Sequence, residues 1–212
     1  MTTVIVDYES GNLHSAEKAF QRMAQEQGHG PVIVTADPEV VRKADRVVLP
    51  GDGAFPACQQ ALFNHSGLFE AIEEVAIKQG KPFLGICIGM QMLATRGLEY
   101  TETKGFDWIA GTVDKIRPTD STLKVPHMGW NDLVIDTAHP VFDGVKTGDH
   151  TYFVHSYHFT VDTAAERLAH VDYGTEVTAI VGRDNLLGFQ FHPEKSQQIG
   201  LHLIANFLNW KP

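Results

Sequence analysis

Short, nearly continuous runs of apolar residues recur through the first half of the chain. Four of them lie at residues 3–6, 32–35, 47–49 and 83–86. A strand that is covered on both faces is apolar throughout, whereas a half-exposed strand alternates between apolar and polar residues. The pattern therefore predicts a largely parallel sheet with both faces buried.

Segments of helical periodicity separate these runs. In residues 13–27 and 68–78, apolar side chains recur every three or four positions along one stripe. Each segment ends close to a glycine, Gly28 or Gly80, as helices commonly do. Alternating strands and helices predict an open α/β sheet with helices on both faces and ligand sites at the carboxyl ends of the strands.

The second half of the chain is predicted to be an antiparallel or mixed β-rich portion. Beyond Gly97, short stretches are rich in β-forming residues or alternate between apolar and polar, with turn residues between them. These stretches lie at residues 112–117, 133–136, 152–159, 168–172 and 177–181.

An apolar strand at residues 187–191 and an amphipathic helix at residues 199–210 close the pattern. No repeat, linker or low-complexity tract interrupts the sequence. Residues 1–212 are therefore expected to form a single domain.

Composition argues against several classes of protein. Lys and Arg number 17 against 26 for Asp and Glu, and a nucleic-acid backbone would repel the resulting net charge of −9. The mean hydropathy is −0.14, and neither a long apolar run nor the features of a secretory signal are present. We therefore expect a cytoplasmic protein that binds neither nucleic acid nor membranes.

The two cysteines, Cys58 and Cys87, do not form a C-x-x-C pair. In a reducing compartment this arrangement predicts no zinc or redox site, and we expect neither a metal nor a cofactor. We interpret Cys58, near the start of an expected helix, as a packing residue. Cys87 is the candidate for chemistry.

Cys87 stands where a buried strand is expected to turn into a short helix at residues 90–94. Gly85 and Gly89 flank it, and a sharp strand-to-helix turn of this kind presents its central side chain as a nucleophile. The helix N-terminus favours the thiolate, which is the nucleophilic form. The alternative interpretation is an inert, buried cysteine in a glycine-rich turn.

A general base and its orienting acid are suggested by His192-Pro193-Glu194. Pro193 favours an extended backbone at His192, so the side chains of His192 and Glu194 project to the same side. A carboxylate bonded to one ring nitrogen fixes the imidazole tautomer and stabilises the imidazolium. The segment follows an apolar strand, at the sheet edge where Cys87 is expected. Without that cysteine it would be interpreted as a loop.

Backbone donors for an oxyanion are expected at two places. The amide of Ile88 opens the helix after Cys87. The second source is the turn at residues 50–53, which also follows an apolar strand and contains the amides of Asp52 and Gly53. The glycines of this turn allow a peptide group to flip.

Together these motifs resemble the class I glutamine amidotransferase family over essentially the whole chain. The family pattern Gly-x-Cys-x-Gly-x-Gln is found at residues 85–91, its His-Pro-Glu at residues 192–194, and its oxyanion strand at residues 50–53. The resemblance implies a flavodoxin-like fold. It also implies hydrolysis of glutamine to glutamate and ammonia through a cysteinyl thioester.

Four segments narrow the resemblance to glutaminase subunits that deliver ammonia to a cyclase subunit in histidine biosynthesis. They lie at residues 7–13, 126–131, 153–157 and 192–196. The resemblance implies a heterodimer in which the partner, the cyclase, is a (β/α)8 barrel. It implies glutamine as the small-molecule substrate and no cofactor.

The resemblance also implies roles for individual residues. Cys87 is the nucleophile, His192 the base and Glu194 its orienting acid. The remaining set comprises Asp52, Gly53 and Ile88 for the oxyanion amides, Gln91, Ser156 and Tyr157 for glutamine binding, and Asn12, Trp130 and Lys195 for contact with the partner.

Asp52 departs from the family, many of whose members carry an apolar residue in this turn. A carboxylate beside Cys87 would oppose thiolate formation, so the Asp52 side chain is predicted to point away from the sulfur. Gly51 and Gly53 further suggest that the Asp52 amide is turned away until the loaded partner binds. This hypothesis predicts little glutaminase activity for the isolated chain.

Two other functions stay open at this point. Another glutaminase of the same fold, serving pyridoxal phosphate or anthranilate synthesis, or a γ-glutamyl hydrolase, would share Cys87 and His192 but should lack the segment at residues 126–131. A flavodoxin-like binding module would carry an inert Cys87, whose thiol would react slowly with alkylating reagents. The histidines at positions 127, 155 and 158 fall within or beside the narrower motifs, and either a structural or a functional role is open to them.

Overall fold

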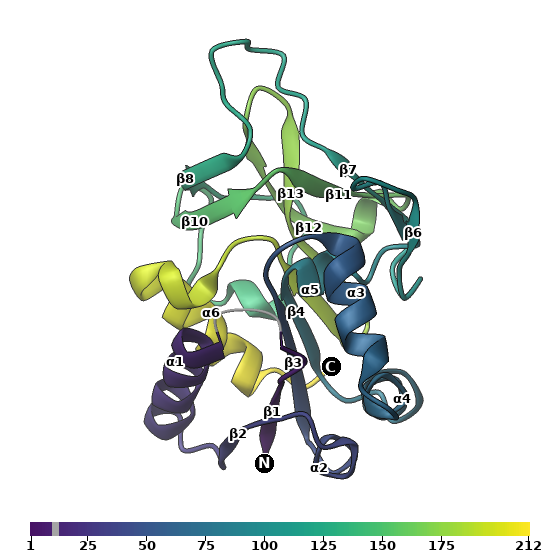
Figure 1. The fold of residues 1–212 in the computed structure, drawn as a ribbon. Helices are drawn as coiled ribbons and strands as arrows, with labels where there is room; N and C mark the ends of the chain where they lie inside the picture. Colours follow the sequence, from purple (N-terminus) through teal and green to yellow (C-terminus); the bar gives the residue numbers. More distant parts are fainter. Residues whose placement is uncertain (10–12) are drawn as a thin grey trace.

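A large mixed sheet forms the centre of the protein in the computed structural model, which describes residues 1–9 and 13–212. Within these residues the sheet has eight strands, with bounds β1 (Thr3–Val6), β2 (Val32–Thr35), β3 (Arg46–Gly51), β4 (Phe83–Cys87), β9 (Val134–Ile135), β12 (Arg167–Asp172), β13 (Glu176–Arg183) and β14 (Leu186–Phe189). Their order across the sheet is β2-β1-β3-β4-β14-β13-β12-β9 (Figure 1).

The first five strands of this order run parallel, as the apolar runs predict. Strands β1, β3 and β4 are buried along their whole length. Strand β2 is only half-buried, because it lies at the edge of the sheet and has a neighbour on one side alone. The prediction of uniform burial is therefore wrong for β2.

The remaining strands form the predicted antiparallel portion. Strands β13, β12 and β9 continue the central sheet in antiparallel pairs. Two smaller sheets in the described residues stand above the carboxyl ends of the parallel strands in Figure 1. Their strands are β5 (Arg96–Gly97), β6 (Thr103–Lys104), β7 (Gly111–Lys115), β8 (His127–Asp132), β10 (His150–His155) and β11 (Tyr157–Val161).

One predicted strand is wrong in its extent. Residues 152–159 form two strands, β10 and β11, which separate at Ser156 and belong to different sheets. Strand β10 pairs with β8, whereas β11 pairs with β7. Residues that favour strands stand on both sides of Ser156, so the sequence pattern does not reveal that the strand changes its partner there.

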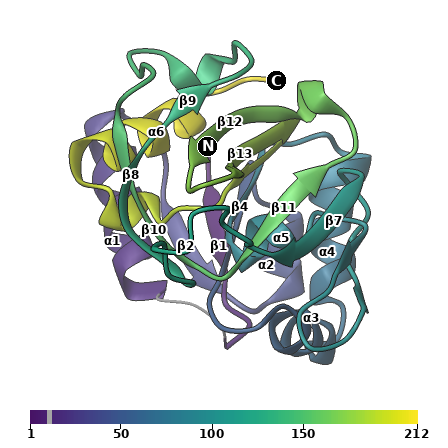
Figure 2. The ribbon, with the colours of Figure 1, turned by 90° about the horizontal axis from the view of Figure 1, so that it is seen from above.

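Helices cover both faces of the central sheet (Figures 1 and 2). On one face α1 packs against α6, and on the other α4 contacts both α2 and α3. Gly28 and Gly80, at the ends of the two predicted helices, have positive φ values of 70° and 62°. No helix in the described ranges is long and apolar enough to cross a membrane. The helix bounds are α1 (Leu13–Glu26), α2 (Pro38–Arg42), α3 (Phe55–Asn64), α4 (Leu68–Glu73) with a wider turn over Glu74–Lys78, α5 (Ile88–Gln91) and α6 (Gln197–Asn209), with short 3-10 turns at Pro140–Phe142, Ala164–Glu166 and Pro193–Lys195.

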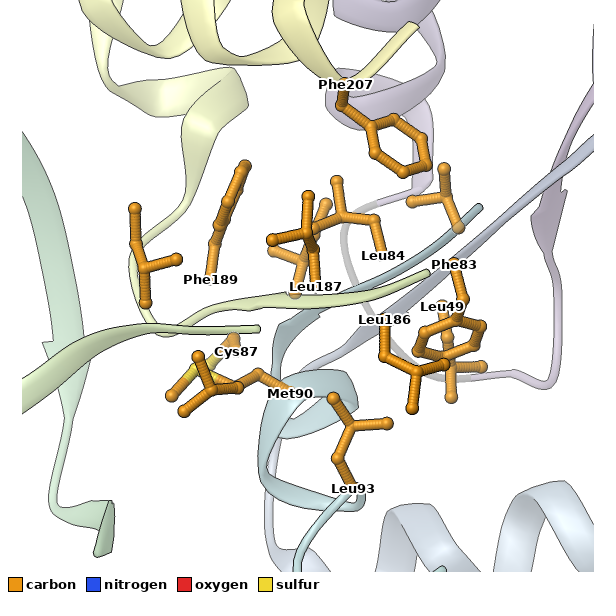
Figure 3. Packing of buried hydrophobic residues seen from close by; sticks show 14 of the residues in the cluster. Leu49, Phe83, Leu84, Cys87, Met90, Leu93, Leu186, Leu187, Phe189 and Phe207 are labelled. Atoms are coloured by element: carbon orange, nitrogen blue, oxygen red, sulfur yellow. The ribbon is translucent and has the colours of Figure 1, made fainter. Parts of the chain in front are cut away.

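The core and the candidate site meet at the carboxyl end of β4. Cys87 belongs to the buried hydrophobic cluster, part of which is drawn in Figure 3. Gly51, at the end of β3, is in register with Cys87, and Phe189, at the end of β14, is in register with Ile86. The carboxyl ends of three parallel strands, β3, β4 and β14, therefore lie at one edge of the sheet.

Candidate active site

Cys87 occupies a strained turn between β4 and α5. Its φ of 56° and ψ of −112° lie in a region that non-glycine residues rarely adopt. A side chain at Gly85 would collide with the carbonyl oxygen of Gly89, and one at Gly89 would collide with the carbonyl oxygen of Leu49. The two glycines therefore let α5 begin directly at Ile88, two residues before the predicted start, and fold back against β3 and β4.

His192 and Glu194 follow β14 and form a hydrogen-bonded pair. Nδ1 of His192 lies 2.8 Å from Oε1 of Glu194, and both side chains are buried. The backbone of His192 is extended, as Pro193 predicts. Ser196 fixes the segment, because its hydroxyl donates to the carbonyl of His192 at 2.7 Å. The imidazole is thus held by a carboxylate on a rigid turn.

The surroundings of His192 favour its protonated form. Burial lowers the pKa of His192. Hydrogen bonds to Cys87 and Glu194, together with the charges of both, outweigh this effect and raise the pKa to about 10. A protonated imidazole between a carboxylate and a thiol is placed to donate a proton to a leaving group and, once neutral, to take one from water. The imidazole thus interacts with a carboxylate and with a thiol, which is the arrangement that acyl transfer by a triad requires.

A cavity of about 180 Å³ opens beside the sulfur of Cys87. Its lining comes from the turn after β3, from α5 and from the junction of β10 and β11. His192 is not part of this lining, and it is connected to the cavity through Cys87. The structure gathers around the cavity, with Cys87, all the residues predicted for the oxyanion and for glutamine binding: Asp52, Gly53, Ile88, Gln91, Ser156 and Tyr157.

Gln91 is fixed by two hydrogen bonds at the cavity wall. Its Nε2 donates to the carbonyl of Tyr157 and to Oε1 of Gln190, both at 3.0 Å. Its Oε1 is buried and has no hydrogen-bond partner among the described residues. A buried acceptor of this kind is costly unless a ligand pairs with it, so Gln91 is suited to receive a donor from a substrate.

Two residues of the site, Gln190 beside Cys87 and Glu99 in the cavity lining, are not found by sequence reasoning. Gln190 is fully buried in the chain after β14, and its Nε2 lies 3.9 Å from Sγ of Cys87. A polar residue within the apolar run at 187–191 is a signal that could have identified it. Glu99 lines the cavity at 8% exposure and accepts a 2.7 Å hydrogen bond from the amide of Phe55. Nothing in its local sequence marks it.

The predicted oxyanion turn lies beside the nucleophile. Gly51 ends β3 opposite Cys87, and Gly53 adopts a φ of 112°, which favours glycine. Asp52 is exposed to solvent, whereas Cys87 is buried. The direction of the Asp52 carboxylate relative to the sulfur stays a prediction.

His127 and His155, two histidines of the narrower motifs, are buried and contact each other. Nδ1 of His127 lies 3.1 Å from Nε2 of His155, and Nδ1 of His155 lies 2.8 Å from the carbonyl of Tyr157. Burial lowers the pKa of His127 to about 4 and that of His155 to about 3. Burial also lowers the pKa of His158. His155 thus contacts the carbonyl that holds Gln91, and His127 contacts His155.

Trp130 and Lys195, two of the three residues predicted to contact a partner, are not part of the cavity lining. Trp130 on β8 is 48% exposed, with its ring edge-on to Tyr152, and Met128 on the same strand is 61% exposed. Lys195 is exposed directly after Glu194. Asn12 lies outside the described residues. Large apolar side chains on β8 are therefore presented to solvent.

Comparisons with known proteins identify similar sequences over nearly the whole chain. The family model described as glutamine amidotransferase class-I matches residues 4–210. The chain is 69% identical over 212 residues to imidazole glycerol phosphate synthase subunit HisH of Cereibacter sphaeroides, and 65% identical to the protein of that name from Ruegeria pomeroyi. Each alignment covers all of both chains.

Solved structures share the fold at low sequence identity. A crystal structure of a glutamine amidotransferase superposes with a TM-score of 0.71 at 18% identity, and the match covers 98% of this chain and 99% of the other. The glutaminase domain of CTPS from Trypanosoma brucei gives a TM-score of 0.66 at 15% identity, over 100% and 95% of the two chains. The mixed α/β architecture predicted from the sequence is thus confirmed.

Proposed function

This chain belongs to the class-I glutamine amidotransferase family, and on that premise we propose that it is the glutaminase subunit of an imidazole glycerol phosphate synthase. It hydrolyses glutamine to glutamate and ammonia, and its partner uses the ammonia in histidine biosynthesis. The observation that carries the proposal is the strained turn at Cys87, coupled to the hydrogen-bonded pair of His192 and Glu194 beside a cavity.

The first half of the reaction forms a thioester. The thiolate of Cys87 attacks the side-chain carbonyl carbon of glutamine, and the carbon–nitrogen bond breaks as the imidazolium of His192 donates its proton to the departing nitrogen. The amide of Ile88, which opens α5, and the amide of Asp52 stabilise the oxyanion that forms between these events, with Gly53 completing the turn. Ammonia leaves, and His192 becomes neutral.

The second half hydrolyses the thioester. Neutral His192 removes a proton from water, the hydroxide adds to the thioester carbon, and glutamate leaves as the sulfur regains its negative charge. Glu194 keeps the imidazole oriented and stabilises its charged form in both halves. The pKa of about 10 for His192 supports this role, because the imidazole is then protonated and ready to donate at neutral pH.

Recognition of the rest of glutamine is assigned to the cavity wall. The unpaired Oε1 of Gln91 accepts a hydrogen bond from the substrate. Ser156 and Tyr157 line the same cavity. The carboxylate of Glu99 is the acidic group suited to the α-ammonium group of an amino acid. Small, polar and partly enclosed, this cavity fits an amino acid better than an extended ligand.

The partner that we propose is the cyclase, which is a (β/α)8 barrel, in a cytoplasmic heterodimer. Ammonia released into neutral water becomes ammonium, which is not a nucleophile, so a glutaminase must deliver ammonia to a docked partner. Trp130, Lys195 and Asn12 are assigned to the docking face, and the exposure of Trp130 and Lys195 supports that assignment. The single domain over residues 1–212 likewise stays our prediction.

Comparison of the two nitrogen sources tests the proposal. The chain is assembled with the cyclase subunit, and synthesis is measured with glutamine and, separately, with ammonium salts. The variant Cys87→Ala is expected to abolish glutamine-dependent synthesis and to leave ammonia-dependent synthesis intact. Loss of both activities in a correctly assembled complex would contradict the role of Cys87.

A further inference from the structure

Tyr8 holds one side of the predicted oxyanion turn. Its hydroxyl donates a 2.6 Å hydrogen bond to the carbonyl of Pro50, and the side chain is fully buried. The same hydroxyl lies only 2.8 Å from the position that a Cβ atom on Gly51 would occupy. Tyr8 therefore both anchors the peptide before Gly51 and restricts the space around that residue.

Cys58 holds the other side of the turn. It lies in the first turns of α3 at 2% exposure, and its Sγ donates a 3.2 Å hydrogen bond to the carbonyl of Asp52. The N-terminus of α3 is itself fixed, because Glu99 accepts from the amide of Phe55 and the amide of Cys58 donates to the carbonyl of Ala54. Cys58 is thus more than the packing residue suggested by the sequence.

The two anchored carbonyls belong to the peptide groups on either side of the Gly51–Asp52 peptide. A peptide group between fixed neighbours rotates through opposite changes in ψ of the residue before it and φ of the residue after it. We infer that Tyr8 and Cys58 are positioning residues, which fix the flanking carbonyls so that only the Gly51–Asp52 peptide turns relative to Cys87. The inference rests on the proposed function, in which the amide of that peptide stabilises the oxyanion.

The inference separates the effects on catalysis from those on binding. Neither the hydroxyl of Tyr8 nor the thiol of Cys58 belongs to the cavity lining, so glutamine binding does not depend on them. Alkylation of Cys87 needs the activated sulfur but no oxyanion donor. Loss of either anchor should therefore lower kcat and leave both KM and the alkylation rate of Cys87 unchanged.

The test uses Tyr8→Phe and Cys58→Ala in the assembled complex with the cyclase subunit. Each variant removes one donor with little change in size. Glutamine-dependent kcat is expected to fall roughly three- to tenfold in each, the factor that corresponds to one intramolecular hydrogen bond. Cys58→Ser, which keeps a donor, is expected to restore most of the activity, and ammonia-dependent synthesis is the control for assembly.

Three outcomes are distinguishable. Unchanged kcat in both variants, with an active wild-type complex, overturns the inference and leaves the proposed function standing. A rise in KM, or a parallel fall in the alkylation rate, also overturns it, because either result indicates a general disturbance of the site. A wild-type complex that cannot use glutamine contradicts the proposed function itself.

Discussion

Gly51 lies directly opposite Cys87 in the register of the parallel strands β3 and β4. The turn that carries the predicted oxyanion amides therefore starts at the same level of the sheet as the nucleophile. An ideal Cβ at Gly51 would lie 2.8 Å from the amide nitrogen of Gly89 and 2.8 Å from Cβ of Ile88. The sheet and the glycines together let two backbone segments approach one sulfur atom.

Gly51→Ala is expected to reduce glutamine hydrolysis at least tenfold, because the new methyl group must displace the backbone that begins α5. Ammonia-dependent synthesis by the complex should remain, since the cyclase site is on the partner. Steady-state assays with both nitrogen sources measure the effect. The matched control is Gly28→Ala, which adds the same methyl group at a strained position after α1, where nothing lies within 4 Å. Equal activity in the two variants would argue against this geometry.

Glu194→Gln is expected to lower kcat by about tenfold or more, because it keeps the shape of the orienting group and removes its charge. The pKa of His192 should fall from about 10, since the Glu194 charge is one of the causes that raise it. NMR titration of the imidazole and pH-dependent kinetics measure the two effects. Glu176→Gln, which changes an exposed glutamate paired with Arg167, is the control.

The same pair predicts how stability depends on pH. A group whose pKa is raised on folding stabilises the folded state below its unfolded pKa, and this stabilisation is lost as pH rises through the folded pKa. For His192 the window runs from 6.5 to about 10. In denaturant unfolding, the free energy of unfolding should therefore be higher for the wild type than for Glu194→Gln below pH 6.5. This difference should shrink as the pH rises towards 10. A difference in the free energy of unfolding that grows with pH would contradict this prediction.

The triad was predictable because each part is marked within a few residues. The glycines around Cys87 predict the turn. Pro193 predicts the extended backbone that places His192 beside Glu194. The parallel strands were predictable for the same reason, since burial on both faces leaves an uninterrupted apolar run.

The supporting contacts were not predictable, because they join distant parts of the chain. Gln190 contacts Gln91 across 99 positions and Cys87 across 103. Cys58 looks like any buried helical cysteine until the fold places its thiol at the carbonyl of Asp52. The position of Glu99 depends on a contact with the amide of Phe55 at the start of α3, 44 residues earlier in the chain. The local sequence around each residue therefore does not predict these long-range contacts.

Alkylation should distinguish the two cysteines within one chain. Both are buried, at 4% for Cys87 and 2% for Cys58, but only Cys87 lines the cavity and is coupled to His192. Iodoacetamide at neutral pH is therefore expected to label Cys87 first, as read by peptide mass spectrometry. His192→Asn should slow that labelling at least tenfold, with Cys58 as the internal control. Equal, slow labelling of both thiols would favour the inert binding module.

Trp130 is expected to be a major contributor to partner binding. It is 48% exposed on β8, beside the still more exposed Met128, and large aromatic residues of this kind are frequent hot spots in interfaces. Trp130→Ala should weaken binding to the cyclase subunit by roughly 30-fold, the factor for about 2 kcal/mol. Phe63→Ala is the matched control, because Phe63 has the same 48% exposure but lies on α3. Titration calorimetry with the purified cyclase should leave the Phe63 variant at the wild-type affinity, and equal losses in both variants would exclude a docking face centred on β8.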